Sequence, residues 1–197
     1  MSTKPNYLIA GLGNPGNKYS HTRHNIGFKA IDSMAHHYSI PLFKQDDVEY
    51  GIGTITNKRI LLVKPQAFMN RSGPPVYRLA QKYRILDEKI IIIHDDLDLV
   101  FGRLKIKGKG GSGGHKGICS LMDAMGKRNF IRIRIGIGRP ENGQSIMDYI
   151  LGVFTPDETV ALNRIITRVR DAIKTILCQG IREAMNSFND KRLKTSS

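Results

Sequence analysis

The chain has 197 residues and a formal net charge of +14, from 31 basic and 17 acidic side chains. This length fits one domain, because domains usually hold about 100–200 residues. The two cysteines, Cys119 and Cys178, exclude a disulfide framework and suit a reducing cytosol. The polar start MSTKPN gives no targeting signal, and no segment approaches the roughly 18 apolar residues of a membrane span. We therefore expect a cytoplasmic protein with a polyanionic partner.

The first half of the chain alternates predicted strands and helices. Apolar runs and helical spacing predict a buried strand at Tyr7–Gly11, a helix over 22–38, and a hairpin formed by 50–56 and 59–63. After the loop KPQAFMNRSG, a helix begins at Pro74 or Pro75 and ends at Tyr83, since proline suits a first turn. A further strand is expected at Lys89–Ile93, directly before the polar segment HDDLD.

The second half begins with a strand at Arg103–Lys107, the loop GKGGSGGHKG and a short helix over Ile118–Met125. The strand FIRIRIGIG at 130–138 alternates, so its isoleucines face one side and Arg132 and Arg134 the other. TPDE at 155–158 predicts a capping box that opens a long helix ending at Gly180. Further helical turns reach Phe188, and about 190–197 form a basic tail. Strands mixed with helices predict an α/β fold on a mixed sheet.

Basic residues are concentrated in one part of the sequence. Between positions 99 and 147 ten lysines and arginines face two acidic residues, Asp123 and Glu141. A surface that serves only solubility normally mixes both signs. The distribution therefore favours an anion-binding face.

Two glycine-rich motifs suggest other chemistry. GLGNPG at 11–16 matches the dinucleotide pattern G-x-G-x-x-G. However, Pro15 lacks an N–H, the next helix begins late, and no acidic residue ends a second strand about 20 positions on. GGSGG at 110–114 resembles a nucleophile elbow, but no histidine follows His115, and the loop also lacks the P-loop ending. A loop whose backbone approaches an anion stays open.

The segment IIIHDDLDL, 91–99, ends an apolar run in one histidine and three aspartates. A metal site is one interpretation, although the EF-hand glycine and glutamate are absent. Aspartates that cap loop amides are another. A third is a carboxylate that orients a histidine, because open α/β sheets place sites at strand ends. His24 is a candidate partner, since it lies at a predicted helix start, where imidazolium is disfavoured.

Five segments together resemble the bacterial-type peptidyl-tRNA hydrolase family: GLGNPGNKYSHTRHNIGF, KPQAFMNRSG, IIIHDDLDL, GGSGGHKG and RIRIGIGRP. The resemblance runs from Tyr7 to ILGVF, near the end of the chain. It implies a single α/β domain with a twisted mixed sheet surrounded by helices. It also implies a monomeric, cytoplasmic enzyme that cleaves the ester joining a peptide to the 3′ end of tRNA, without metal or cofactor.

The resemblance assigns roles to individual residues. His24 would be the general base that activates water, and Asp95 the carboxylate that supports it. Asn14 would contact the peptide and discriminate N-blocked from free aminoacyl-tRNA. Asn70 would hold water or donate to a developing oxyanion. The tRNA end would be bound by Tyr19, Phe68 and Asn70, with Met69 beside them.

The resemblance also implies a partner for the basic residues, the acceptor stem of tRNA. An A-form acceptor stem is recognised mostly through phosphates and 2′-hydroxyls, and we expect Lys105, Lys107, Lys109, Arg132 and Arg134 to contact phosphates. One position departs from the family, because Lys116 stands in GGHKG where asparagine is usual. Lysine only donates hydrogen bonds and adds a charge, so Lys116 would bind a phosphate or a substrate carbonyl.

Two alternatives remain at this stage. An RNA-binding protein of the same fold, similar to the family's plant organelle splicing cofactors, would lack hydrolysis. A dinucleotide-binding oxidoreductase would use GLGNPG instead.

Overall fold

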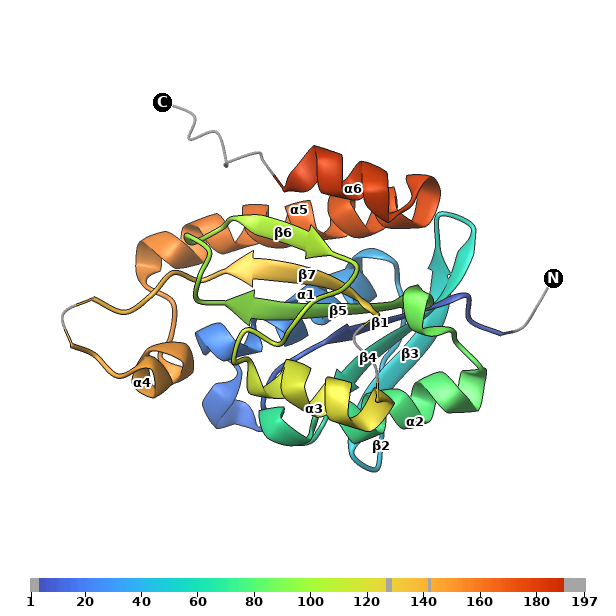
Figure 1. Ribbon diagram of the computed structural model, residues 1–197, viewed down its shortest axis with the longest axis horizontal. Helices are drawn as coiled ribbons and strands as arrows, with labels where there is room; N and C mark the ends of the chain where they lie inside the picture. Colours follow the sequence, from blue (N-terminus) through green and yellow to red (C-terminus); the bar gives the residue numbers. More distant parts are fainter. Residues whose placement is uncertain (1–3, 127–128, 142, 190–197) are drawn as a thin grey trace.

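The computed structural model describes residues 4–126, 129–141 and 143–189, so the basic tail predicted at 190–197 lies outside the described residues. One mixed sheet of seven strands forms the centre, in the order β2-β3-β4-β1-β5-β7-β6 (Figure 1). The strands are β1 (Tyr7–Gly11), β2 (Phe43–Gln45), β3 (Val48–Ile55), β4 (Lys58–Pro65), β5 (Ile90–Asp96), β6 (Leu104–Lys107) and β7 (Ile131–Gly136).

The middle of the sheet is parallel. β1 pairs in parallel with β4 and β5, and β5 in parallel with β7. Every residue of β5 is buried, as expected for a parallel strand covered on both faces. The flanking pairs β2–β3, β3–β4 and β6–β7 are antiparallel. Because β1 and β5 are parallel neighbours, their carboxyl ends meet at one edge.

The β3–β4 hairpin was predicted and is present, with Ile55 opposite Lys58. Its two turn residues are Thr56 and Asn57, both in the left-handed region with φ of 47° and 63°. This is the backbone of a type I′ turn, which matches the twist of the strands it joins.

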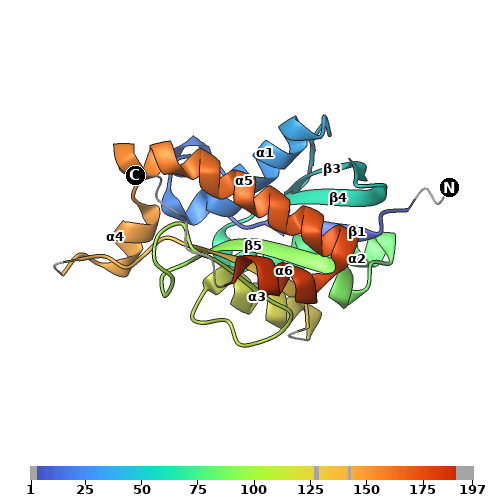
Figure 2. The ribbon, with the colours of Figure 1, turned by 90° about the horizontal axis from the view of Figure 1, so that it is seen from above.

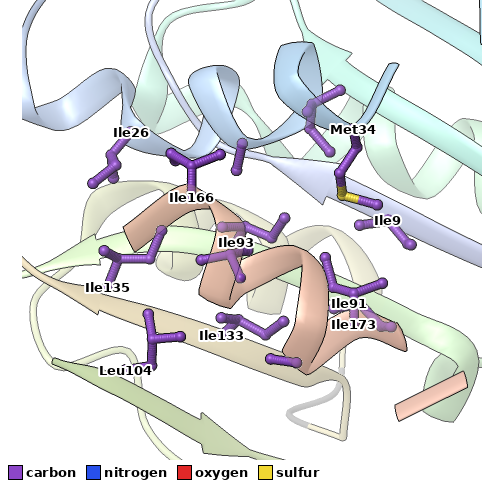
Figure 3. Close-up of a cluster of buried hydrophobic side chains, with 14 of the residues drawn as sticks. Ile9, Ile26, Met34, Ile91, Ile93, Leu104, Ile133, Ile135, Ile166 and Ile173 are labelled. Atoms are coloured by element: carbon purple, nitrogen blue, oxygen red, sulfur yellow. The ribbon is translucent and has the colours of Figure 1, made fainter. Parts of the chain in front are cut away.

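Helices cover both faces of the sheet (Figure 2). They are α1 (Ile26–His37), α2 (Gly73–Tyr83), α3 (Lys116–Met125), α4 (Ile146–Leu151), α5 (Pro156–Gln179) and α6 (Ile181–Phe188). α1 and α5 pack on one face over isoleucines such as Ile93 and Ile133 (Figure 3). α2 and α3 pack on the other face, over Leu8, Ile92 and Phe130 among others. The prediction of a single α/β domain on a mixed sheet surrounded by helices is confirmed.

The end of α6 protects the edge strand β6. The Asn189 side chain donates to the carbonyl of Ile106 at 3.1 Å, and its Oδ1 accepts from the Ile106 N–H at 2.6 Å. A covered edge strand cannot template pairing with another chain.

Several predicted boundaries are confirmed and others shift. The capping box at Thr155 is present, with Glu158 bonded back to the Thr155 N–H at 2.7 Å. β5 extends through Asp96, whereas we expected the strand to end at Ile93. β2 and α4 were not predicted, because three exposed residues and a six-residue helix carry too little periodicity. None of the described helices has the length and hydropathy that a bilayer span requires.

Candidate active site

The candidate site lies where β1 and β5 end and α1 begins. After β1 the chain forms the loop that contains Asn14, and a short 3₁₀ turn at Arg23–Asn25 precedes α1. This turn brings His24 towards the last residues of β5. The arrangement follows the general rule that open α/β sheets place sites beyond the carboxyl ends of their strands.

His24 and Asp95 form a buried pair. The His24 Nδ1 lies 2.9 Å from Oδ1 and 3.0 Å from Oδ2 of Asp95. Burial by itself would raise the pKa of the Asp95 carboxyl, but the facing His24 and His115 rings outweigh it and hold that pKa well below its ordinary value. Asp95 is therefore ionised and accepts hydrogen bonds from the rings that face it.

His115 is a second histidine on the same carboxylate, and the sequence analysis did not assign it a role. Its Nε2 lies 3.0 Å from Asp95 Oδ1. Its Nδ1 accepts the N–H groups of Gly117 and Ile118, at 3.1 and 3.3 Å, and so caps α3. Because Nδ1 is an acceptor, the ring proton sits on Nε2 and is donated to Asp95. The signal in the sequence was a histidine at the end of a glycine-rich loop, just before a helix.

His94 precedes Asp95 on β5 but does not contact its carboxylate. Its Nδ1 lies 2.7 Å from the backbone carbonyl of Asp95, to which it donates. Burial lowers the pKa of the His94 ring well below its ordinary value, and the neighbouring His115 lowers it further. His94 is therefore a neutral ring beside His115.

A pair of asparagines fixes the loop after β1. The Asn25 side chain accepts the Asn14 N–H at 2.9 Å and donates to the Asn14 carbonyl at 2.8 Å. The Oδ1 of Asn14 accepts the Met69 N–H at 2.8 Å. This oxygen is thereby occupied, so the Nδ2 group of Asn14 is the part left for a ligand. Asn25 was missed by sequence analysis, although it follows His24 directly.

The His24 segment is also anchored by the C-terminal part of the chain. The Arg23 guanidinium donates to the Val153 carbonyl and to Glu158 Oε2, both at 2.6 Å. It also lies over the Tyr149 ring, 4.4 Å from the ring centroid. Because Glu158 belongs to the capping box of α5, the start of α5 and the turn that carries His24 are held together.

These residues border a cavity of about 690 Å³, within the range of small-molecule sites. Eight of the residues singled out in the sequence line it: Asn14, Tyr19, His24, Phe68, Met69, Asn70, Asp95 and Lys116. α4 supplies an apolar wall through Ile146, Met147, Ile150 and Leu151. The donor atoms of His24, Asp95 and His115 lie within 4.8 Å of one another, close enough to be considered as metal ligands.

The predicted phosphate contacts lie outside this cavity. Lys105 and Lys107 are partly exposed on the edge strand β6, and Lys109 is exposed in the loop after it. Arg134 is partly exposed, but its Nε donates to Asp96.

Arg132 differs most from the prediction. It is only 3% exposed, and its guanidinium donates to the carbonyls of Gly110 and Gly111. The alternating pattern correctly separated Arg132 from the isoleucines of β7, but it did not show that a loop covers the arginine face. Arg132 therefore holds the glycine-rich loop and is not presented to a phosphate.

The chain has close relatives among known proteins. A family model described as peptidyl-tRNA hydrolase matches residues 8–196. A peptidyl-tRNA hydrolase of Bacillus licheniformis is 44% identical over 185 residues, covering 93% of this chain and 98% of the relative. That of Bacillus subtilis is 43% identical over 185 residues, with the same coverage of both chains.

Solved structures agree with this result. The crystal structure of peptidyl-tRNA hydrolase from Acinetobacter baumannii matches with a TM-score of 0.88 and 35% identity, over 98% of this chain and 99% of that one. Matches of this identity and length in sequence and in structure lead to one conclusion. The chain belongs to the peptidyl-tRNA hydrolase family.

Proposed function

We propose that the cavity around Asp95 is where this peptidyl-tRNA hydrolase cleaves its substrate and releases tRNA, with His24 as the general base. The observation that carries the proposal is the buried contact of 2.9 Å between His24 Nδ1 and Asp95, two residues that line the cavity of about 690 Å³. A histidine oriented by an ionised carboxylate is the arrangement that activates nucleophiles in many hydrolases.

The proton movements follow from the tautomer of His24. Nδ1–H donates to Asp95, so Nε2 carries a lone pair and accepts a proton from water as the water attacks the ester carbonyl. Asp95 stabilises the imidazolium that forms. The tetrahedral intermediate then breaks the bond between the carbonyl carbon and the 3′ oxygen of tRNA. The leaving oxygen takes the proton from Nε2, which restores the neutral ring.

His115 and Asn25 act as positioning residues. His115 donates to the same Asp95 oxygen that faces His24, so it fixes the carboxylate while its other nitrogen is held by α3. Asn25 fixes the backbone of Asn14 through two hydrogen bonds. Such supporting contacts keep reacting groups within the narrow geometry that catalysis requires.

The rest of the cavity serves the two parts of the substrate. The free amide group of Asn14 is suited to donate to a carbonyl of the peptide, and the exposed Asn70 amide to the developing oxyanion. Tyr19 and Phe68 form an edge-to-face pair, 6.4 Å between centroids, and offer faces for the terminal base of tRNA, with Met69 beneath them. An ester is reactive enough that the proposed route needs no metal.

The acceptor stem is assigned to the basic surface beside the cavity. Lys105, Lys107 and Lys109 lie along β6 and the following loop, and Lys116 at the start of α3 borders the cavity itself. We further propose that the enzyme works as a monomer in the cytoplasm, as the resemblance to its family implies.

The test is hydrolysis of N-acetyl-aminoacyl-tRNA and of free aminoacyl-tRNA, with a chelator present. We expect cleavage of the blocked substrate alone, and a loss of about 10²–10⁴ in rate for His24→Ala, the usual contribution of a general base. His21→Ala is the matched control, because His21 is exposed and close by in sequence. Full activity in His24→Ala would contradict the assignment.

A further inference from the structure

Two histidines share one carboxylate at the base of the cavity. Asp95 Oδ1 lies 2.9 Å from His24 Nδ1 and 3.0 Å from His115 Nε2, and the two ring centroids are 5.2 Å apart. His24 alone serves as the general base, and His115, besides holding the carboxylate, completes a set of three potential metal ligands. Two imidazoles and one carboxylate are a ligand set that Zn²⁺ commonly takes, with a fourth position left for water.

We propose that His24, Asp95 and His115 bind Zn²⁺ or a similar borderline transition metal ion, and that binding blocks hydrolysis. The blocking half of this inference rests on the proposed function of His24. A metal ion on His24 Nδ1 displaces the proton of that nitrogen, so the neutral ring carries its proton on Nε2. Nε2 then has no lone pair, and water cannot be deprotonated there.

The required movements are small. Zn²⁺ binds nitrogen and oxygen at about 2.0–2.2 Å, which places tetrahedral ligands about 3.4 Å apart. The Asp95–histidine distances of 2.9 and 3.0 Å must open slightly, while the two ring nitrogens, which lie within 4.8 Å, must approach each other. The site faces the cavity, which provides an entry path and room for a bound water.

The metal competes with the cap of α3. Ligation through His115 Nε2 moves the ring proton to Nδ1, so the N–H groups of Gly117 and Ile118 lose their acceptor. Zinc binding should therefore loosen the first turn of α3, which contains Lys116. This coupling gives a signature that a metal ion bound elsewhere on the surface would not produce.

A third ring at the site also has an unused lone pair. His94 donates through Nδ1, so its Nε2 is an acceptor, and this buried atom has no hydrogen-bond partner among the described residues. The His94 ring lies 4.6 Å from the His115 ring, centroid to centroid. A buried nitrogen left in this state, on a side chain that lines the cavity, is an independent sign of an unfilled position.

Isothermal titration of the full chain with ZnCl₂ tests the site. We expect one saturable site, and a loss of roughly tenfold or more in affinity for His115→Asn, since even outer partners of metal ligands act on this scale. Asparagine is a good N-cap, so this variant keeps the start of α3 while removing the ring nitrogen. The control His36→Ala/His37→Ala removes two exposed histidines of α1 and should leave the affinity unchanged.

Two further readouts complete the test. Zn²⁺ should inhibit hydrolysis reversibly, with recovery on adding EDTA, and should speed amide exchange at Gly117. Wild-type affinity in His115→Asn, loss of affinity in the control, or the absence of saturable binding would overturn the metal site without touching the proposed function. Zinc binding that leaves hydrolysis unchanged would overturn the blocking step, and it would also count against His24 as the base.

Discussion

The apolar and the polar residues of the sheet have different roles, and β7 shows the contrast within one strand. Its isoleucines Ile131, Ile133 and Ile135 point to the face covered by α1 and α5 and are buried among apolar side chains. Arg132 and Arg134 point to the opposite face, where one holds a loop and the other is paired with Asp96. On β5 the two kinds of residue follow one another along the strand. Ile90 to Ile93 are buried in the apolar layers on both faces, and His94, Asp95 and Asp96 come after them at the carboxyl end.

The difference teaches that the isoleucines on both faces stabilise the fold, while the polar residues at the strand ends carry the chemistry. Apolar packing gives stability without specifying a reaction. Charged and titratable groups at the strand ends are buried only where they have partners, as buried charges require. Substitutions of buried isoleucines and of polar residues at the strand ends should therefore separate stability from activity.

The largest effect is expected at Asp95, close to the carboxyl end of β5. Asp95→Asn removes the charge that stabilises the His24 imidazolium, and we expect the rate to fall by about 10²–10⁴. Asp98→Asn is the matched control, because Asp98 is an exposed aspartate paired with Arg139. Single-turnover hydrolysis of N-acetyl-aminoacyl-tRNA measures both. Equal losses in the two variants would remove the distinction between these aspartates.

Substitution of a buried isoleucine should reduce stability and leave turnover almost unchanged. Ile133→Ala leaves a cavity in a fully buried position, and such changes cost about 2–5 kcal/mol of unfolding free energy. The turnover of the remaining folded enzyme should stay close to that of the wild type. Urea unfolding and active-site titration measure the two quantities. An Ile133→Ala variant with reduced turnover and unchanged unfolding free energy would contradict the separation between apolar and polar residues.

His94 should also make the stability of the fold depend on pH. The pKa of His94 in the folded chain lies well below its ordinary value near 6.5, so the unfolded chain takes up a proton first as the pH falls. Stability should therefore decline below about pH 6.5, by up to about 1.4 kcal/mol per pH unit from this group. His94→Gln should flatten that slope between pH 6.5 and 5. The lowered pKa of Asp95 acts only at more acidic pH, below the pKa of an unfolded aspartate.

Surface charge on the edge strand should affect binding moderately. Lys105→Gln and Lys107→Gln should each reduce the dependence of tRNA affinity on salt, by about one unit in the log–log slope per phosphate contact. Lys174→Gln, on the exposed side of α5, makes the same charge change as a control. Titrations at several salt concentrations give the slopes. An unchanged slope in both β6 variants would place the acceptor stem elsewhere.

The smallest effect is expected at Lys116. Its side chain is exposed at the first position of α3, and asparagine also offers a donor there. Lys116→Asn should change kcat/KM by less than about tenfold, or about 1.4 kcal/mol. Activity below that of His24→Ala would show that Lys116 is essential in this enzyme.

Local patterns predicted much of the fold. The strand at Tyr7–Gly11, the hairpin, the capping box at Thr155 and the stop at Gly180 follow from periodicity, turn chemistry and caps, which act over a few residues. Short or exposed elements such as β2 and α4 left no comparable signal. The resemblance to known hydrolases selected His24 and Asp95, which spacing alone could not pair.

What sequence reasoning missed depends on contacts between distant segments. The alternation in β7 gave the face of Arg132 but not the glycine-rich loop that covers it. Likewise, His115 was visible as a histidine, but its bond to Asp95 exists only because α3 begins beside the end of β5. Such contacts follow from the assembled fold and not from local pattern.

The hydrogen bonds from Arg23 to Val153 and Glu158, at the start of α5, have a consequence for the order in which the active site is completed during synthesis. A growing chain is itself esterified to tRNA, and so it carries the bond that the finished enzyme cleaves. The partners of Arg23 at Val153 and Glu158 are synthesised 130 and 135 residues after it. This contact can therefore form only after Val153 and Glu158 have been synthesised, later than His24, Asp95 and His115, so the active-site residues are all in the chain before the anchor that holds the His24 turn.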